Sequence, residues 1–549
     1  MKKRWILLLA ALLAAMLAFA ACGNNDGDAA EEGDTPPAQP AQAGWVPEWP
    51  DGHRPAVVPT QTTKTHLEIV TTGLPVAKNA IGSNDSASAE FSRLVYQTLF
   101  RLDYDTGEPM NELATGYEFI DAQTIRIFVR EGVTFHNGDP LTAHDVAFSL
   151  TRAGASEEMA ILFGMIDRAE AVSDTEVILY LEFAFAPIIL HLAHNGGAIV
   201  PMNHINAVGE DHFRDNPIGS GAFEFVRMID GDRIEYRRFE NYSGNMPVIE
   251  TITMRLVPEA SVRVVEVSTG TADVALGVMP ADINVATNDP NVNLLRRRTM
   301  GIDLIWFNAI ENHPRRPGGE NPLANPLVRQ AINYAFDTEA AISLVFLGAG
   351  GVLHTVLPEG VFGFVEQPPF ETNIERAREL LAEAGYADGF DAEIWWNSPN
   401  ATRQQIAEMM QAALQPLNIN LTIVTLEWGE YLDRSAAAEH DMLILGWSTV
   451  TGDADYGLHP LFHSANFGAA GNRSFFKSEE LDALLDAGRT ETDTARRLQI
   501  YADALAYLRQ NAPVVMLRQG EMMVAVSPSL RNITLNPVQA HNWGTVFFE

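Results

Sequence analysis

Cys22 is the only cysteine among the 549 residues of the chain. No disulfide can therefore link two parts of the chain, and no structural zinc site can be built from several thiolates. After residue 63 about 485 residues remain, which exceeds the roughly 250–300 residues at which a single core stops growing. The sequence therefore predicts two or three lobes that fold without disulfide bridges.

The first 22 residues have the pattern of an export signal. A basic start at Lys2 to Arg4 precedes an apolar run that ends at Phe19, and two alanines stand before Cys22. The run is too short for a comfortable transmembrane anchor. Its end resembles the bacterial lipobox, although Phe19 stands where Leu is usual. We therefore expect a signal peptide over 1–21 and a lipidated Cys22; the alternative is an ordinary secretory signal with an incidental cysteine.

Residues 22–63 are predicted to form a disordered tether, because acidic residues, proline, alanine and glutamine dominate them. The whole chain is acidic, with 37 Lys and Arg against 71 Asp and Glu and a formal net charge of −34. Such a surface repels phosphate backbones, so nucleic acid is excluded as a partner. No later stretch reaches about 18 uninterrupted apolar residues, so no second membrane segment is predicted.

Short strand-like runs and amphipathic helical stretches alternate along the body. Residues 124–129, 232–239 and 251–257 alternate between apolar and polar side chains as strands do. Thr142 followed by Asp145 indicates a capping box at the start of a helix. Further helices are predicted to begin at Pro326 and to cover 374–384 and 494–511. This mixture predicts α/β or α+β lobes rather than a barrel or a bundle.

A series of sequence blocks extends through the body, including Phe135-His136-Asn137-Gly138 and the segment that follows it. In chain order the blocks are residues 111–119, 126–138, 141–150, 217–223, 239–242, 270–274, 328–337 and 380–386. Together they resemble the family 5 extracellular solute-binding proteins, the peptide and nickel receptors of ABC importers.

This resemblance implies a fold and its domain boundaries. The fold is α/β and periplasmic-binding-protein-like, of type II and cluster C, with two lobes, an interlobe cleft and an additional subdomain in the N-terminal half. Lobe I would comprise 64–99, 217–303 and 519–549, and lobe II would comprise 304–518. The extra subdomain would cover 100–216. A ligand between the lobes stabilises the closed form through contacts that the open form lacks.

The resemblance also implies a function. We expect a monomeric, lipid-anchored receptor outside the cytoplasm that delivers a short peptide to an ABC permease and needs no cofactor. A Gram-positive cell surface is favoured over a periplasm. The alternatives are a nickel or other small-solute receptor of the same family and, from a different class, a surface-anchored hydrolase or adhesion lipoprotein. No nucleophile elbow, phosphate loop or zinc-protease helix motif is present, so we expect no enzyme.

The loop at 446–461 indicates which class of peptide ligand to expect. In the dipeptide and oligopeptide receptors this loop carries an aspartate that pairs with the peptide ammonium, but that position is Val450 here. The sequence from Ser448 to Asp455 instead resembles that of the glutathione-binding branch of the family. Hydroxyl groups there can bind carboxylates or amides, and an aspartate can bind an ammonium. The alternative is an Asx turn that caps a helix beginning near Tyr456. The expected contacts in this loop are Trp447, Ser448, Thr449, Thr451, Asp453 and Asp455.

Four further residues are candidates for ligand contact. Asn84 and Ser86 follow the first strand of the body, in a loop that faces the cleft in this family. Of the adjacent pair Trp395 and Trp396, alternation places one indole in the core and one outward, and we assign Trp396 to the cleft. Arg473 can hold a carboxylate through its planar fork, although a surface arginine is the common alternative.

A metal site is the weaker alternative. His459 and His463 have helical i, i+4 spacing near Asp453 and Asp455, which is a ligand-like grouping. Pro460 lies between the two histidines, and no cysteine supports them. We therefore interpret them as capping or surface histidines and predict no metal ligand.

Overall fold

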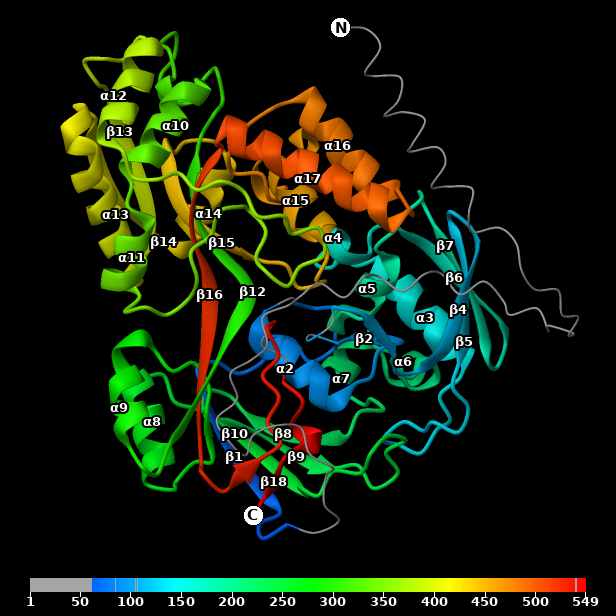
Figure 1. Cartoon of the computed structure of the whole chain (residues 1–549). Helices are drawn as coiled ribbons and strands as arrows, with labels where there is room; N and C mark the ends of the chain where they lie inside the picture. Colours follow the sequence, from blue (N-terminus) through cyan, green and yellow to red (C-terminus); the bar gives the residue numbers. More distant parts are fainter. Residues whose placement is uncertain (1–61, 84, 104, 106, 539–540) are drawn as a thin grey trace, which may run out of the picture. The chain divides into compact units, whose positions relative to one another are not determined.

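The computed structural model describes residues 62–83, 85–103, 105, 107–538 and 541–549. Strands and helices alternate along this part of the chain, which confirms the predicted α/β composition. A large sheet carries most of the strands (Figure 1). In spatial order its strands are β14 (Asn420–Glu427), β13 (Asp391–Ser398), β15 (Met442–Ser448), β12 (Asn293–Phe307), β16 (Val514–Val526), β11 (Val274–Ala275), β1 (His66–Thr71), β10 (Thr251–Leu256), β9 (Arg233–Arg238) and β8 (Phe223–Ile229).

The long strands β12 and β16 occupy the middle of this order and pair antiparallel (Figure 1). Their register shifts between Arg298 and Ile302. Such a bulge bends a strand and increases its local twist. These two strands extend into both halves of the sheet. The residue ranges expected for the two lobes and the extra subdomain remain predictions.

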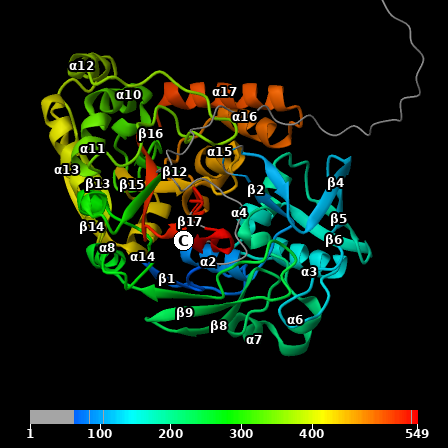
Figure 2. The same cartoon turned by 60° about the horizontal axis from the view of Figure 1, so that its bottom comes forward.

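Helices cover both faces of the β13 to β15 half of the sheet (Figure 2). On one face Trp395 joins a buried cluster with Leu443 and Tyr501, and on the other Trp396 joins one with Ile444 and Met410. The helices here are α10 (Pro326–Ala335), α11 (Thr338–Val345), α12 (Ile374–Glu383), α13 (Ala401–Leu414), α14 (Trp428–Ala436), α15 (Ala454–Phe462), α16 (Glu479–Thr490) and α17 (Thr494–Asn511).

A separate four-stranded sheet supports α3 (Ala143–Gly154) in the N-terminal half. Its strands are β4 (Ala114–Asp121), β5 (Thr124–Val129), β7 (Glu176–Leu181) and β6 (Ile166–Ser173). The predicted capping box begins α3, and the Thr142 backbone N–H donates to the Asp145 carboxylate at 2.9 Å. The smaller elements α5 (Ile188–Leu192) and η1 (Asn195–Gly197) follow this sheet.

Most predicted elements have their expected ends within a residue or two, because caps and breakers fixed them. The helix α2 covers Ser86–Val95, and β2 (Phe100–Leu102) follows. Tyr96 turns to an extended conformation, and the backbone N–H of Gly221 donates to the Val95 carbonyl at 2.9 Å. The end of α2 therefore depends on a contact with a distant segment.

Candidate ligand-binding site

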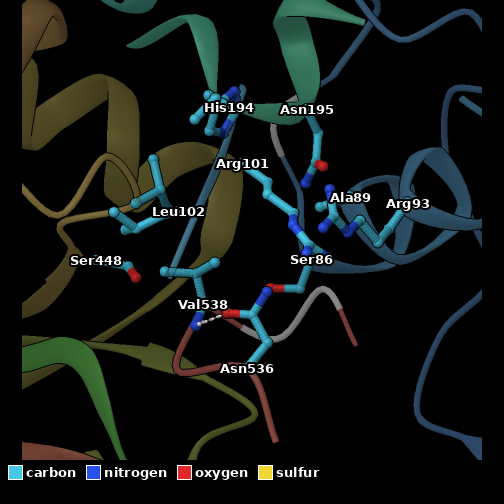
Figure 3. Close-up of a pocket in the computed structure, with 12 residues that line it drawn as sticks. Ser86, Ala89, Arg93, Arg101, Leu102, His194, Asn195, Ser448, Asn536 and Val538 are labelled. Carbon is cyan, nitrogen blue, oxygen red and sulfur yellow. Dashed lines mark hydrogen bonds between the residues drawn. The ribbon is translucent and has the colours of Figure 1, made fainter. Parts of the chain in front are cut away.

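A pocket of about 60 Å³ lies where distant segments of the chain meet (Figure 3). It receives side chains from α2, from β2, from the turn between α5 and η1, from the end of β15 and from the C-terminal loop. The residues around it are Ser86, Ala89, Arg93, Arg101, Leu102, Ala193, His194, Asn195, Ser448, Val450, Asn536 and Val538.

Two arginines give this pocket a positive charge. The Arg93 guanidinium lies 3.7 Å from the Glu112 carboxylate, which already accepts hydrogen bonds from the Thr98 N–H and hydroxyl at 3.0 Å each. Arg101 makes no hydrogen bond or ion pair with any described residue. Neither aspartate nor glutamate is among the described residues that line the pocket. The site is therefore suited to an anionic group.

Neutral polar groups complete the lining. His194 Nδ1 accepts a hydrogen bond from the Gly196 N–H at 3.1 Å, which leaves Nε2 as the protonated ring nitrogen of the neutral imidazole. Burial lowers the pKa of His194 to about 3, so the ring is neutral near pH 7. Figure 3 shows the Arg93, Arg101 and Asn195 side chains extending toward the same region beside Ser86. Donors thus predominate over acceptors in this part of the pocket.

A second cavity, of about 280 Å³, adjoins the first, and Ser86 lines both. Its wall is rich in methionine, which adapts to apolar groups of varied shape: Met254, Met279, Met522 and Met523. Glu90 also lines it and accepts hydrogen bonds from the His541 N–H at 2.8 Å and from the Trp543 indole. Burial raises the pKa of Glu90 to about 8 despite these bonds. The two cavities therefore offer a cationic and a largely apolar compartment.

Two of the residues predicted from the sequence line the first pocket. Ser86 begins α2, and Ser448 ends β15. Asn84 lies outside the described residues, as does Cys22. Val450, at the position where the dipeptide receptors carry an ammonium-binding aspartate, is also in the lining.

Asp453 and Asp455 have other partners. The Asp453 carboxylate is fully buried, accepts the Asp455 N–H at 2.9 Å as the cap of α15, and pairs with both terminal nitrogens of Arg497 at 2.7 and 2.6 Å. Asp455 pairs with Arg489 at 2.9 and 3.1 Å. Burial opposes its ionisation, yet Arg489 holds the pKa of this carboxyl below its usual range. The capping alternative describes Asp453, and neither carboxylate is available to a ligand ammonium.

The other polar residues of this loop are also buried away from the pocket lining. Thr449 and Thr451 are 0% and 1% exposed, and the Thr451 hydroxyl accepts the Asp453 N–H at 3.4 Å. The Trp447 indole N–H donates to the Tyr456 carbonyl at 3.0 Å. Of the residues expected from this loop, only Ser448 lines the pocket.

The expectation of one outward indole in β13 is wrong. Trp396 is 7% exposed and Trp395 is fully buried, because helices cover both faces of this strand. Arg473 is also buried, and its guanidinium donates to the Leu432 carbonyl at 3.1 Å. Burial lowers the pKa of Arg473. Neither Trp396 nor Arg473 lines the pockets described above.

His459 and His463 stack with ring centroids 4.5 Å apart, and their Nε2 atoms lie 3.5 and 3.4 Å from an Asp486 carboxylate oxygen. The three side chains are close enough to share a metal ion. However, Nδ1 of His463 accepts the Ala465 N–H at 3.0 Å, and Nδ1 of His459 lies 3.2 Å from the Asn466 amide nitrogen. These contacts place the proton of the neutral imidazole on Nε2 in both rings, and a metal ion bound there would have to displace it.

Sequence reasoning missed Arg93, Arg101, His194, Asn195 and Asn536, which all line the pocket. The two arginines resemble the many paired arginines of this chain when only the sequence is known. In the structure Arg101 has no ion pair with a described residue, and Arg93 has a single one, with Glu112 at 3.7 Å. Whether an arginine is paired depends on contacts across the fold. A local signal was available only for Ser86, beside the cap of α2.

No helix in the described part of the chain has the length and apolar character needed to span a membrane. Comparison with known proteins places the chain among solute-binding proteins. It is 28% identical over 487 residues to the dipeptide-binding protein of Escherichia coli, covering 83% of this chain and 89% of that protein. It is also 28% identical over 469 residues to a glutathione-binding protein of Pectobacterium atrosepticum, covering 83% and 88%.

A solved structure supports the same assignment. The dipeptide-binding protein of a Pseudoalteromonas species, crystallised with Met-Leu, superposes with a TM-score of 0.76 at 25% identity and covers 88% of this chain and 100% of its own. The fold is thus the predicted type II periplasmic-binding fold. Residues 108–469 match the family model for bacterial extracellular solute-binding proteins, family 5. The chain belongs to this family of extracellular solute-binding proteins.

Proposed function

We propose that this protein is a lipid-anchored receptor that captures a short peptide and delivers it to the permease of an ABC importer. Relatives of similar length are named for dipeptide and glutathione binding, and a structural neighbour holds the dipeptide Met-Leu. Cys22 would carry the lipid and residues 23–63 would act as the tether. This arrangement keeps a receptor near the permease without a transmembrane helix of its own.

The observation that carries the proposal is the composition of the pocket around Arg101. Its wall combines segments near residues 86–102, 193–195, 448–450 and 536–538. A ligand that contacts all of these segments joins parts of the chain that are distant in sequence. It stabilises the conformation in which they lie close together. A permease that recognises this arrangement can distinguish the loaded receptor from the empty one.

Glutathione suits this pocket better than a simple dipeptide does. It carries two carboxylates and one ammonium, and the pocket offers two arginines and no carboxylate among its described lining residues. Val450 cannot bind an ammonium at the position where the dipeptide receptors have an aspartate. The Ser448 hydroxyl, the Asn195 amide and the Asn536 side chain can bind peptide amide groups.

Calorimetric titration of the full-length protein with glutathione, a dipeptide, a longer peptide and Ni²⁺ tests the proposal. We expect saturable heat and a raised melting temperature with glutathione, without product formation. The Ser448→Ala variant should bind more weakly, whereas Ser464→Ala, outside the lining, should bind as the native chain does. Tight Ni²⁺ binding without peptide binding, or hydrolysis of the peptide, would overturn the proposal.

The anchor needs its own test. Metabolic labelling with a radioactive fatty acid should mark the native protein and not the Cys22→Ala variant. Release of the unaltered protein into the medium, with no label, would favour the ordinary secretory signal.

A further inference from the structure

We propose that the pocket around Arg101 selects its peptide by charge and prefers anionic peptides to neutral and cationic ones. In this proposal Arg101 is the principal anchor for a ligand carboxylate and Arg93 is the second. The inference rests on the proposed peptide-receptor function and specifies the ligand class for the same site.

Arg101 is exceptional in an acidic protein. The chain has 71 acidic residues against 37 Lys and Arg, and its buried arginines are well supplied with partners. Arg497 binds Asp453 through two nitrogens, and Arg329 donates to three backbone carbonyl groups. Arg101 is half-buried in the pocket wall and has no hydrogen-bonding partner among the described residues. A partly desolvated guanidinium without a counter-ion is unfavourable, and a ligand anion would remove that penalty.

Arg93 supports the same inference from a different element. It extends from α2, whereas Arg101 belongs to β2, and both guanidinium groups line one small pocket. The nearest carboxylate to Arg93, that of Glu112, is 3.7 Å away and is already bonded to Thr98. Two like charges in one pocket repel each other. A carboxylate bound between them relieves the repulsion and can accept paired N–H bonds from either planar fork.

The described residues of the lining include no carboxylate that would neutralise a cationic group. Leu102, Val450 and Val538 are apolar, and His194 presents a neutral ring. The nearby carboxylates of Asp453 and Asp455 are held by Arg497 and Arg489. An additional ligand ammonium would therefore lose hydration without gaining a counter-ion, whereas an additional carboxylate would gain one.

A titration with three dipeptides of similar size tests this selection. Ala-Glu, Ala-Ala and Ala-Lys have net charges of −1, 0 and +1 near pH 7. For the full-length native protein we expect affinity to fall in that order. In Arg101→Gln the affinity for Ala-Glu should fall by about tenfold to a hundredfold, the range for a lost charge-assisted hydrogen bond, with a smaller change for Ala-Ala. Arg101→Lys should retain part of the preference, since it keeps the charge and loses the fork.

Arg227→Gln is the matched control. Arg227 lies on an exposed part of β8, where it pairs with Glu235 of β9, and it does not line the pocket. Its loss should therefore leave all three affinities unchanged. Equal affinities for the three dipeptides, or an equal loss for all three in Arg101→Gln, would overturn charge selection and leave the peptide-receptor function standing. Failure of every peptide, glutathione included, would instead overturn the receptor function on which the inference rests.

Discussion

Two regions of this protein hold arginines in partly or fully buried positions, and they use them differently. At the start of α15, Arg497 and Arg489 pair with Asp453 and Asp455, so the charges there are neutralised within the protein. In the ligand pocket, Arg101 has no partner among the described residues. The first arrangement stabilises the fold. In our proposal, the second leaves Arg101 able to pair with a ligand anion.

The largest expected effect concerns the paired region. Asp453→Asn leaves Arg497 buried without its counter-ion, and we expect the free energy of unfolding to fall by about 3–5 kcal/mol. Urea denaturation followed by circular dichroism measures the change. Glu430→Gln is the control, because it removes an exposed i, i+4 pair with Arg434 that is worth roughly 0.3–0.5 kcal/mol. A stable Asp453→Asn variant that no longer bound glutathione would instead show that Asp453 contacts the ligand.

A smaller effect depends on pH and concerns one buried histidine in the pocket and one outside it. Burial lowers the pKa of both His194, in the pocket, and His440, outside it, to about 3. Between this value and about 6.5 the unfolded chain binds a proton that the folded chain does not, so stability falls as the pH falls through this interval. Replacing either histidine by Gln should reduce the slope of unfolding free energy against pH by about 1.4 kcal/mol per pH unit.

The same two variants should differ in ligand binding. His194→Gln changes a pocket residue and should weaken glutathione binding, whereas His440→Gln should not, since His440 is bonded to the Arg473 carbonyl outside the pocket. Isothermal titration at pH 7.5, above the titration interval, measures this directly. Equal affinities of the two variants would contradict the assignment of His194 to the binding site.

The smallest expected effect is on the stability of a variant in the pocket, Arg101→Gln. Arg101→Gln removes a charge that has no partner among the described residues, so the free energy of unfolding should change by no more than about 0.5 kcal/mol. Thermal unfolding without ligand provides the measurement. A loss above about 2 kcal/mol, as expected when a buried partner is left unsatisfied, would mean that Arg101 has a structural role.

Local sequence signals predicted much of the fold because each acts within a few residues. The Thr142 and Asp145 capping box began α3, Asn325 before Pro326 began α10, and the helix at 494–511 has the predicted ends. The predictions failed where distant contacts decided the outcome. The burial of both tryptophans in β13, where one outward indole was expected, depends on helices packed on opposite faces of the sheet.

The family and the mixed α/β fold could be predicted from the sequence, because they depend on ordered blocks and short-range chemistry, whereas for Asp453 the sequence left ligand contact and helix capping open. The sequence also placed Ser86 and Ser448 near the site. The pairing of each arginine depends on the tertiary structure, which leaves Arg101 without an ion pair among the described residues. Asp453 and Arg497 are 44 positions apart yet form an ion pair, whereas Arg93 and Arg101, from two successive elements, both line the pocket. Charge pairing depends on distance in space and on burial, and neither can be read from positions along the chain.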